Sequence, residues 1–343
     1  MSAISFDAIN TPMDLQGDTD MKSDFNRRQA LTLGAGTALA LGACAEGTAS
    51  SETKTAAVKK KDLVLDFKDN VWNRDAMARI HGNLDFTKEK IGWYEGKAIG
   101  IMPGKKNVEL CGFEGFSVTR LLPLEDGSYR KLLREVGFYK DLKTGEILET
   151  FDNPYTGETV KVVPIANDPF NFTISEYYPT PPSYGGLNKA APPKIPLILD
   201  WKMRGDLVLL TSDIHLFYPS SLQPDEWPRE SPGPMSQVSE MFRFYIDPEQ
   251  LGDPDNTSVT FHGSWVRSTP WFPWMLMDQA PGQCLYVCDQ GAGDTFDIVT
   301  DRILEAARAI DPKFLSAPTE DYGPSLSSLE NYKLTEKPAP VKG

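Results

Sequence analysis

Residues 90–165 consist of short apolar-rich segments that turn residues interrupt repeatedly. Three of the interruptions, at residues 125–127, 143–145 and 155–157, each end in a glycine. Glycine adopts a positive φ in such turns at no steric cost, and the segments between them have the length of strands. Consecutive hairpins form an antiparallel meander, whose edges must be closed or covered. The pattern predicts a mainly β domain, folded either as a closed, calycin-like barrel or as a two-sheet sandwich.

Further elements are predicted on both sides of this meander, so we expect one β-rich domain over residues 62–318 and a C-terminal tail over residues 319–343. Apolar residues at helical spacing indicate peripheral helices at residues 70–81 and 294–310. His81 lies in the last turn of the first helix, where a cap or a partner for the helix dipole is the expected role. Strands are expected at residues 207–219, 240–247, 258–268 and 282–290.

The first 44 residues have the pattern of an export signal. Arg27 and Arg28 precede a weakly apolar run, and Cys44 follows it in the sequence LGAC. The run is too short to span a bilayer, which takes about 20 apolar residues. The paired arginines resemble a twin-arginine signal and LGAC resembles a lipobox, so we expect a periplasmic protein anchored to the outer membrane by lipid on Cys44, with residues 45–61 as a tether. An ordinary secretory signal with a chance cysteine is the alternative, and Met21 is an alternative start.

The charge and the absent motifs exclude several classes of function. A formal net charge of -13 argues against a nucleic-acid surface, which needs clustered lysine and arginine. The sequence has no Gly-rich phosphate loop, no GxSxG, no HExxH and no CxxC pair. We therefore expect no nucleotide cofactor and no metal site. The cysteines that remain after Cys44 are expected to be buried free thiols, because an odd three cannot all pair in one chain.

Polar residues recur on strand faces where apolar residues are expected. In the segment 207–219, Asp213 and His215 are two residues apart, so their side chains lie on one face about 7 Å apart. Arg243 and His262 alternate with apolar residues in two further strands. A solvent-facing side of the sheet explains each of them equally well. If these faces line a cavity, His215 or His262 is the candidate general base, with Asp213 orienting an imidazole.

An aromatic segment follows in the strand at residues 258–268 and the turn after it. Trp265, Trp271 and Trp274 form either a wall for a flat apolar ligand or a plug at the end of a barrel, and Tyr245 is a further candidate for ligand contact. Arg267 in the same segment needs an anionic partner if it is buried. That partner is Glu240, Asp213, or a carboxylate or phenolate of a ligand. Arg267 or Arg243 would then hold a developing oxyanion.

Two segments resemble DUF1838, a bacterial family of unknown function. They are FDNPYTGETVKVVPIANDPFN, at residues 151–171, and WVRSTPWFPWMLMDQAPGQCLYV, at residues 265–287. The resemblance covers about residues 62–318 and implies a single domain. It brings no catalytic residues that can be carried over to this chain.

These observations lead to two hypotheses of different classes. The first is a cofactor-free lyase or isomerase that moves a proton on a small hydrophobic or aromatic compound in a β-barrel cavity. The second is a non-catalytic envelope lipoprotein that binds such a compound and needs the aromatic residues but not the histidines. A structural partner in an envelope complex is a third possibility and would present an exposed apolar patch.

Overall fold

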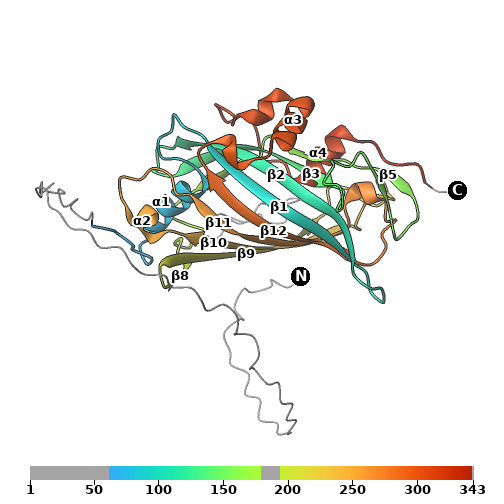
Figure 1. Cartoon of the computed structure of the whole chain (residues 1–343), viewed down its shortest axis with the longest axis horizontal. Helices are drawn as coiled ribbons and strands as arrows, with labels where there is room; N and C mark the ends of the chain where they lie inside the picture. Colours follow the sequence, from blue (N-terminus) through green and yellow to red (C-terminus); the bar gives the residue numbers. More distant parts are fainter. Residues whose placement is uncertain (1–61, 179–193, 342–343) are drawn as a thin grey trace, which may run out of the picture. The chain divides into compact units, whose positions relative to one another are not determined.

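The computed structural model describes residues 62–178 and 194–341, which belong to one compact unit running from Lys59 to Gly343 (Figure 1). The segments expected to form an export signal and a tether, residues 1–44 and 45–61, lie outside the described residues.

The centre of this unit is a ten-stranded antiparallel sheet in the order β6-β3-β2-β1-β12-β11-β10-β9-β8, with β7 also paired to β3 (Figure 1). The strands and the small hairpin of β4 and β5 are β1 (Lys90–Ile101), β2 (Val108–Pro123), β3 (Tyr129–Lys140), β4 (Thr150–Asp152), β5 (Thr159–Lys161), β6 (Ile165–Asn167), β7 (Phe172–Ile174), β8 (Asp200–Arg204), β9 (Leu207–Pro219), β10 (Met235–Ile246), β11 (Phe261–Thr269) and β12 (Gln283–Gly293). The predicted mainly β, antiparallel fold is confirmed. Within the described residues, no strand pairing joins β8 at one edge to β6 or β7 at the other, so the sheet does not close by hydrogen bonds into a barrel.

Short helices flank the sheet. They are α1 (Asn70–His81), α2 (Pro248–Gly252), α3 (Asp301–Ile310) and α4 (Ser328–Thr335), with single 3-10 turns η2 (Pro273–Met275), η3 (Phe296–Ile298) and η4 (Pro312–Leu315). The first predicted helix is confirmed with the bounds expected. The second begins later than expected, because a 3-10 turn precedes it and Thr300 occupies the N-cap position.

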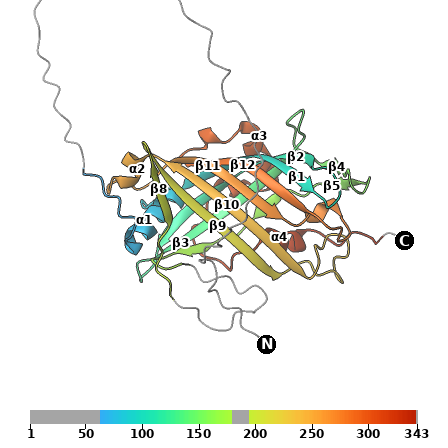
Figure 2. The same ribbon diagram turned by 90° about the horizontal axis from the view of Figure 1, so that it is seen from below.

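The sheet is curved, and one helix identifies its inner face. Ala76 and Ile80 of α1 pack in one cluster with residues of β8 to β12, among them Phe244. Ala78 packs in another cluster with Leu121 of β2 and with β7. Strands from both halves of the sheet therefore lie around the same helix. Figures 1 and 2 agree that α1 lies at one end of the sheet, with β4 and β5 at the other.

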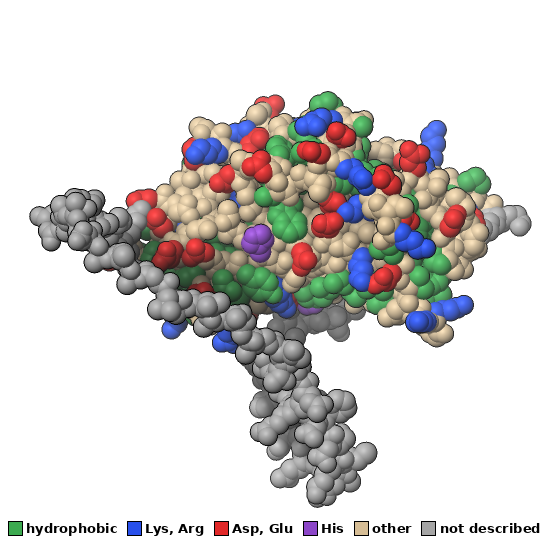
Figure 3. Space-filling model, in the orientation of Figure 1, with side chains coloured by type: hydrophobic (Ala, Val, Ile, Leu, Met, Phe, Trp, Pro, Cys, Tyr) green, Lys and Arg blue, Asp and Glu red, His purple; other side chains and the backbone are tan. Residues whose placement is uncertain are grey.

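The outer face of the sheet is covered only in part. Ile303 and Ala307 of α3 pack against Ile91, Phe116 and Val136, which lie on the outer face of β1, β2 and β3. Over the face seen in Figure 3, acidic and basic side chains are interspersed among apolar ones. The strands β1 to β3 are therefore packed on both faces, which explains why their sequences do not alternate cleanly between apolar and polar residues.

The segment expected to be a C-terminal tail contains the helix α4. Its N-terminus is a capping box, in which Ser327 accepts from the backbone of Glu330 and Glu330 accepts from the backbone of Ser327. Asn331 donates from Nδ2 to Oδ1 of Asn167 in β6 at 3.2 Å. The helix is thereby attached to the β6 edge of the sheet.

Candidate functional site

The structure divides the sequence-predicted site residues between the two faces of the sheet. The strand registers place Arg267 and Trp265 on the inner face, together with Glu240, Phe242 and Tyr286. The other strand residues, namely Asp213, His215, Arg243, Tyr245 and His262, lie on the outer face. The residues expected to share one cavity are therefore not brought together.

The outer-face group forms local contacts instead of a base with an orienting carboxylate. Arg243 donates from Nη1 to Oδ1 of Asp213 at 2.5 Å, and His215 shares a hydrogen bond of 3.0 Å with Ser239 Oγ. In this structure the Asp213 carboxylate pairs with Arg243, and the imidazole of His215 is bonded to Ser239, so the contact between Asp213 and an imidazole stays a prediction. The alternation of apolar and polar residues in β9 correctly separated the two faces of the strand. A repeat of two residues cannot reveal which face points inward.

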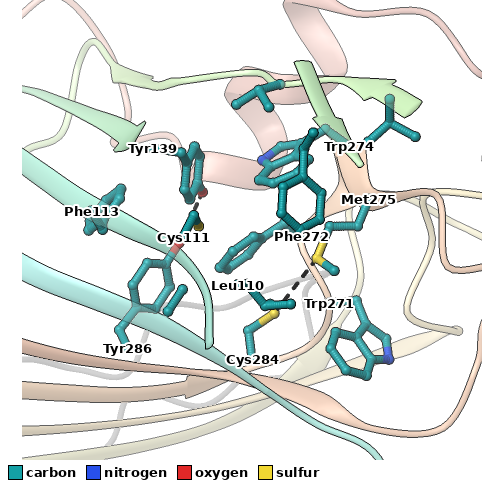
Figure 4. Packing of buried hydrophobic residues seen from close by; sticks show 14 of the residues in the cluster. Leu110, Cys111, Phe113, Tyr139, Trp271, Phe272, Trp274, Met275, Cys284 and Tyr286 are labelled. Carbon is teal, nitrogen blue, oxygen red and sulfur yellow. Dashed lines mark hydrogen bonds between the residues drawn. The ribbon is translucent and has the colours of Figure 1, made fainter. Parts of the chain in front are cut away.

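The aromatic segment after β11 fills one end of the inner face. Trp271, Phe272 and Trp274 are at most 7% exposed and pack with the inner-face residues Phe113 and Tyr139 (Figure 4). The indole of Trp271 donates to the carbonyl of Ala280 at 3.0 Å. Of the two roles left open by the sequence, the arrangement of Trp271 and Trp274 is that of a plug.

The turn that carries this plug has an unusual backbone. Leu276, Asp278 and Gln279 all have positive φ, at 52°, 50° and 60°. Non-glycine residues in this region are strained. Arg229 donates from Nε to Oδ1 of Asp278 at 2.8 Å and from Nη2 to Oε1 of Glu158 at 2.8 Å, which ties the turn to the β4–β5 hairpin. The ion pairs therefore help to hold the turn in its strained conformation.

Between α1 and the plug, four charged residues lie on the inner face. We call Lys131, Glu135, Glu240 and Arg267 the inner charged group. Lys131 and Glu135 belong to β3, near one edge of the sheet. Glu240 and Arg267 belong to β10 and β11, in the other half of the strand order. The side chains of Arg267 and Glu240 are 28% and 19% exposed, so solvent reaches this face although it lies inside the curved sheet.

The electrostatics link these four residues across the inner face. Burial raises the pKa of Glu135, while a hydrogen bond of 2.8 Å from Asn167 and the charge of Arg267 partly offset this. Burial would lower the pKa of Arg267, but the nearby charge of Glu240 raises it above its ordinary value. Burial lowers the pKa of Lys131 to about 8. The inner face thus holds Arg267 as a permanent cation. The pKa values of Glu135 and Lys131 on the same face are shifted in the direction that favours their uncharged forms.

His81 lies next to this group. Its ring packs edge-on against Phe172 and Phe244, at centroid distances of 6.3 and 5.8 Å. Burial, with the charges of Lys131 and Lys90, lowers the pKa of His81 well below its ordinary value. The imidazole is neutral at physiological pH. The sequence correctly placed His81 in the last turn of α1, where a helix cap or dipole partner was the expected role. It did not reveal that this end of the helix faces the interior.

Two buried donors on β11 have no hydrogen-bond acceptor among the described residues. They are Nε of Arg267 and Nε1 of Trp265, which are two positions apart on the same face. The indole of Trp265 lies stacked between Phe242 and Tyr286, with interplanar angles of 15° and 20°. An unpaired buried donor is costly, and a carboxylate, phenolate or carbonyl oxygen is the kind of acceptor that would satisfy these two.

Sequence reasoning missed Lys131 and Glu135, and it assigned to His81 only a role at the end of a helix. The available signal was the segment 129–140, which carries Lys131 and Glu135 two positions either side of Leu133 although the strand lies inside the meander. Charged residues on a central strand are unusual and indicate a functional face.

The described residues contain no grouping of three or more His, Cys, Asp or Glu side chains placed to hold a metal ion. Cys111, Cys284 and Cys288 are buried free thiols, as expected, and burial raises the pKa of each. They are therefore neutral and unsuited to act as thiolate ligands. No helix in the described part of the chain is long and apolar enough to cross a membrane.

A family model described as "Protein of unknown function (DUF1838)" matches residues 87–335. The match includes every strand of the ten-stranded sheet, the plug, and the helix α4. It begins after α1. A comparison with curated proteins found no match.

Proposed function

Because the chain belongs to the DUF1838 family, whose description assigns no activity, we propose a function from the inner face of the sheet. The protein is a cofactor-free enzyme of the lyase or isomerase type, which moves a proton on a small hydrophobic or aromatic compound. The compound carries an anionic or carbonyl oxygen. The single observation that carries the proposal is the pair of unpartnered donors, Arg267 Nε and Trp265 Nε1, beside the partly solvent-exposed inner charged group.

In this proposal the ligand oxygen binds to Arg267 and Trp265. The guanidinium already pairs through Nη1 with Glu240 at 3.5 Å, which keeps it charged and leaves Nε for the ligand. A fixed cation and a fixed N–H donor favour an oxygen that gains negative charge during the reaction. Arg267 therefore keeps the oxyanion role expected from the sequence, and Trp265 keeps its role in ligand contact.

Glu135 is the proposed proton acceptor. Its raised pKa supports this role, because a carboxylate with a raised pKa is a stronger base than an exposed one. It is therefore better matched to removing a proton from carbon. Asn167 donates to Oε2 of Glu135, so Oε1 is the oxygen left for the substrate. His215, His262 and Asp213 have no part in this assignment.

The apolar part of the ligand is expected to lie against the aromatic rings of the inner face. Phe242, Trp265 and Tyr286 form a stack across three neighbouring strands. Tyr94 packs against the same indole at 5.7 Å. Such rings provide a large apolar surface with little side-chain entropy to lose.

The finer fold proposal is an open, barrel-like shell. The packing of α1 at one end and of the plug at the other supports it, because both fill the interior and leave the inner charged group between them. We further propose export and attachment to the outer membrane through Cys44, from the sequence alone.

A retention experiment tests the proposal. The protein from Ala45 onward is incubated with a small-molecule extract rich in aromatic compounds, washed, and the bound compounds are identified by mass spectrometry. We expect retention by the unmodified protein and its loss in Arg267→Met. Retention that survives Arg267→Met unchanged contradicts the proposed anchor. A compound that is retained but never consumed indicates the alternative function, a non-catalytic binding protein.

A further inference from the structure

We propose that Nζ of Lys131 is a nucleophile that forms an imine with the carbonyl carbon of an aldehyde or ketone substrate. The inference rests on the proposed function, because it narrows the substrate class of the same inner face. It assigns a chemical role to a side chain that the proton-transfer scheme leaves unused.

The surroundings of Lys131 distinguish it from the other buried lysine. Lys90 is 1% exposed and donates to three acceptors, the carbonyls of Arg79 and Val259 and the hydroxyl of Ser258. Lys131 is 7% exposed, and its Nζ makes no hydrogen bond or ion pair with any described residue. Its Nζ lies 4.7 Å from the centre of the Phe172 ring. The amine of Lys90 has a structural role, whereas the amine of Lys131 is free to react.

The charges around Lys131 leave a reactive fraction of neutral amine. The facing groups are Glu135 on the same strand, His81 on α1 and Lys90 on β1. Burial lowers the pKa of Lys131 to about 8, although Glu135 opposes the shift. About a tenth of the amine is then neutral at pH 7, compared with less than about a thousandth for an ordinary lysine. Only the neutral amine attacks a carbonyl carbon.

Neighbouring groups account for the protons of the reaction. The lone pair of Lys131 forms the C–N bond while the carbonyl π electrons move to oxygen. The proton that the nitrogen loses passes to this oxygen and gives a carbinolamine. His81, which is neutral and packs against the same Phe172 ring, relays that proton and is neutral again afterwards. Glu135, whose raised pKa favours the protonated form, donates its proton to the departing hydroxyl, which leaves as water. The sum is amine, carbonyl and the Glu135 proton to protonated imine, water and the Glu135 carboxylate, with no oxidant or reductant.

The imine also explains how the proposed proton transfer proceeds without a cofactor. A protonated C=N bond withdraws electrons more strongly than a C=O bond and makes a C–H bond on the adjacent carbon more acidic. Glu135, left as a carboxylate by its donation to the departing hydroxyl, is the base on the same strand face as Lys131. Arg267 and Trp265 then bind a second oxygen of the substrate.

Reductive trapping tests the inference. The protein is treated at pH 7 with sodium cyanoborohydride and either formaldehyde, the smallest aldehyde, or benzaldehyde, and modified lysines are located by peptide mass mapping. Reduction of the imine converts it to a stable secondary amine. We expect Lys131 to be labelled at least tenfold faster than the exposed Lys97 and Lys161, with a rate that rises with pH to a midpoint near 8.

Two variants separate the possible outcomes. Lys131→Arg keeps the charge and must lose the fast label, while labelling of the surface lysines stays the same. If Lys131 reacts with formaldehyde no faster than the surface lysines, the inference is wrong. If that result occurs while Glu135→Gln still abolishes turnover of a retained compound, only the imine is rejected. If Lys131 labels rapidly but no compound is consumed, the proposed function fails and the nucleophile remains.

Discussion

Arg267 and Glu240 occupy directly paired positions on β11 and β10, and Nη1 of the arginine lies 3.5 Å from Oε1 of the glutamate. Both side chains point to the inner face of the curved sheet. The pair engages one nitrogen of the guanidinium and leaves buried Nε without an acceptor. Glu240 therefore fixes the guanidinium without using all of its donors, and in the proposed function the remaining Nε binds the ligand.

The first prediction concerns this cation. Arg267→Met removes a charged donor, and hydrogen bonds to charged groups contribute about 1.5–3 kcal/mol. We expect the affinity for a retained ligand to fall by about 10- to 100-fold, as measured by isothermal titration calorimetry. Arg243→Met on the outer face is the matched control and should leave the affinity unchanged. Equal losses in the two variants would rule out a specific role for Arg267.

Glu135 provides a prediction for the pH dependence of stability. Its folded-state pKa is raised above the ordinary value of 4.5, so the folded protein binds the proton more tightly than the unfolded chain does. Its stabilising contribution is complete below pH 4.5 and is lost as the pH rises through the raised pKa. Glu135→Gln should therefore melt at a higher temperature than the unmodified protein at neutral pH. The difference should shrink as the pH falls to 4.5, and a constant difference would contradict the shifted pKa.

Asn167 connects Glu135 to α4 and tunes the carboxylate. Its Nδ2 donates to Glu135 at 2.8 Å, and this bond lowers the pKa of Glu135. Asn167→Ala should raise that pKa further and move the acidic limb of the pH–rate profile to higher pH. A merely structural role predicts a lower melting temperature with an unshifted limb, so the two readouts distinguish the alternatives.

The two classes of tryptophan should respond differently to substitution. Trp274→Ala removes a plug residue that is 3% exposed, and we expect the free energy of unfolding to fall by about 3–5 kcal/mol in urea titrations. Trp265→Phe keeps the aromatic stack but removes the unpartnered Nε1–H. It should weaken ligand binding with little loss of stability. A large loss of stability in Trp265→Phe with unchanged binding would make Trp265 another packing residue.

The outer-face histidines provide a negative prediction. His215 hydrogen-bonds to Ser239, and His262 packs against Trp93 on the outer face at a centroid distance of 6.3 Å. Replacing both histidines by alanine should leave ligand retention and turnover unchanged. Loss of turnover in this double variant would return the role of general base to His215 or His262, as the sequence pattern had suggested.

Sequence patterns determined the secondary structure of this chain better than the orientation of its faces. The glycines at 127, 145 and 157 have positive φ, as the turn signals predicted, and α1 ends at His81 before Gly82. The alternation in β9 is equally visible in the sequence, yet its polar set faces solvent. Which face points inward depends on curvature and on the packing of α1, and both are long-range properties.

The same limit explains why Lys131 and Glu135 were missed. Their strand is packed on its outer face by α3, where Val136 and Phe138 are buried. Arg130 and Arg134 lie on that same face, so charged residues occur on both faces and produce no simple amphipathic pattern. Arg267 and Trp265 were found because an arginine within an aromatic segment needs an anionic partner wherever it is buried. The requirement for a partner proved more informative than strand periodicity.

Turnover in an aromatic-rich extract tests the central claim most directly. The unmodified protein, Glu135→Gln and the double histidine variant are incubated with the extract, and the compounds consumed and retained are compared by mass spectrometry. The account predicts a compound that the unmodified protein and the histidine variant consume, and that Glu135→Gln retains without consuming. Consumption by Glu135→Gln at the rate of the unmodified protein would contradict it.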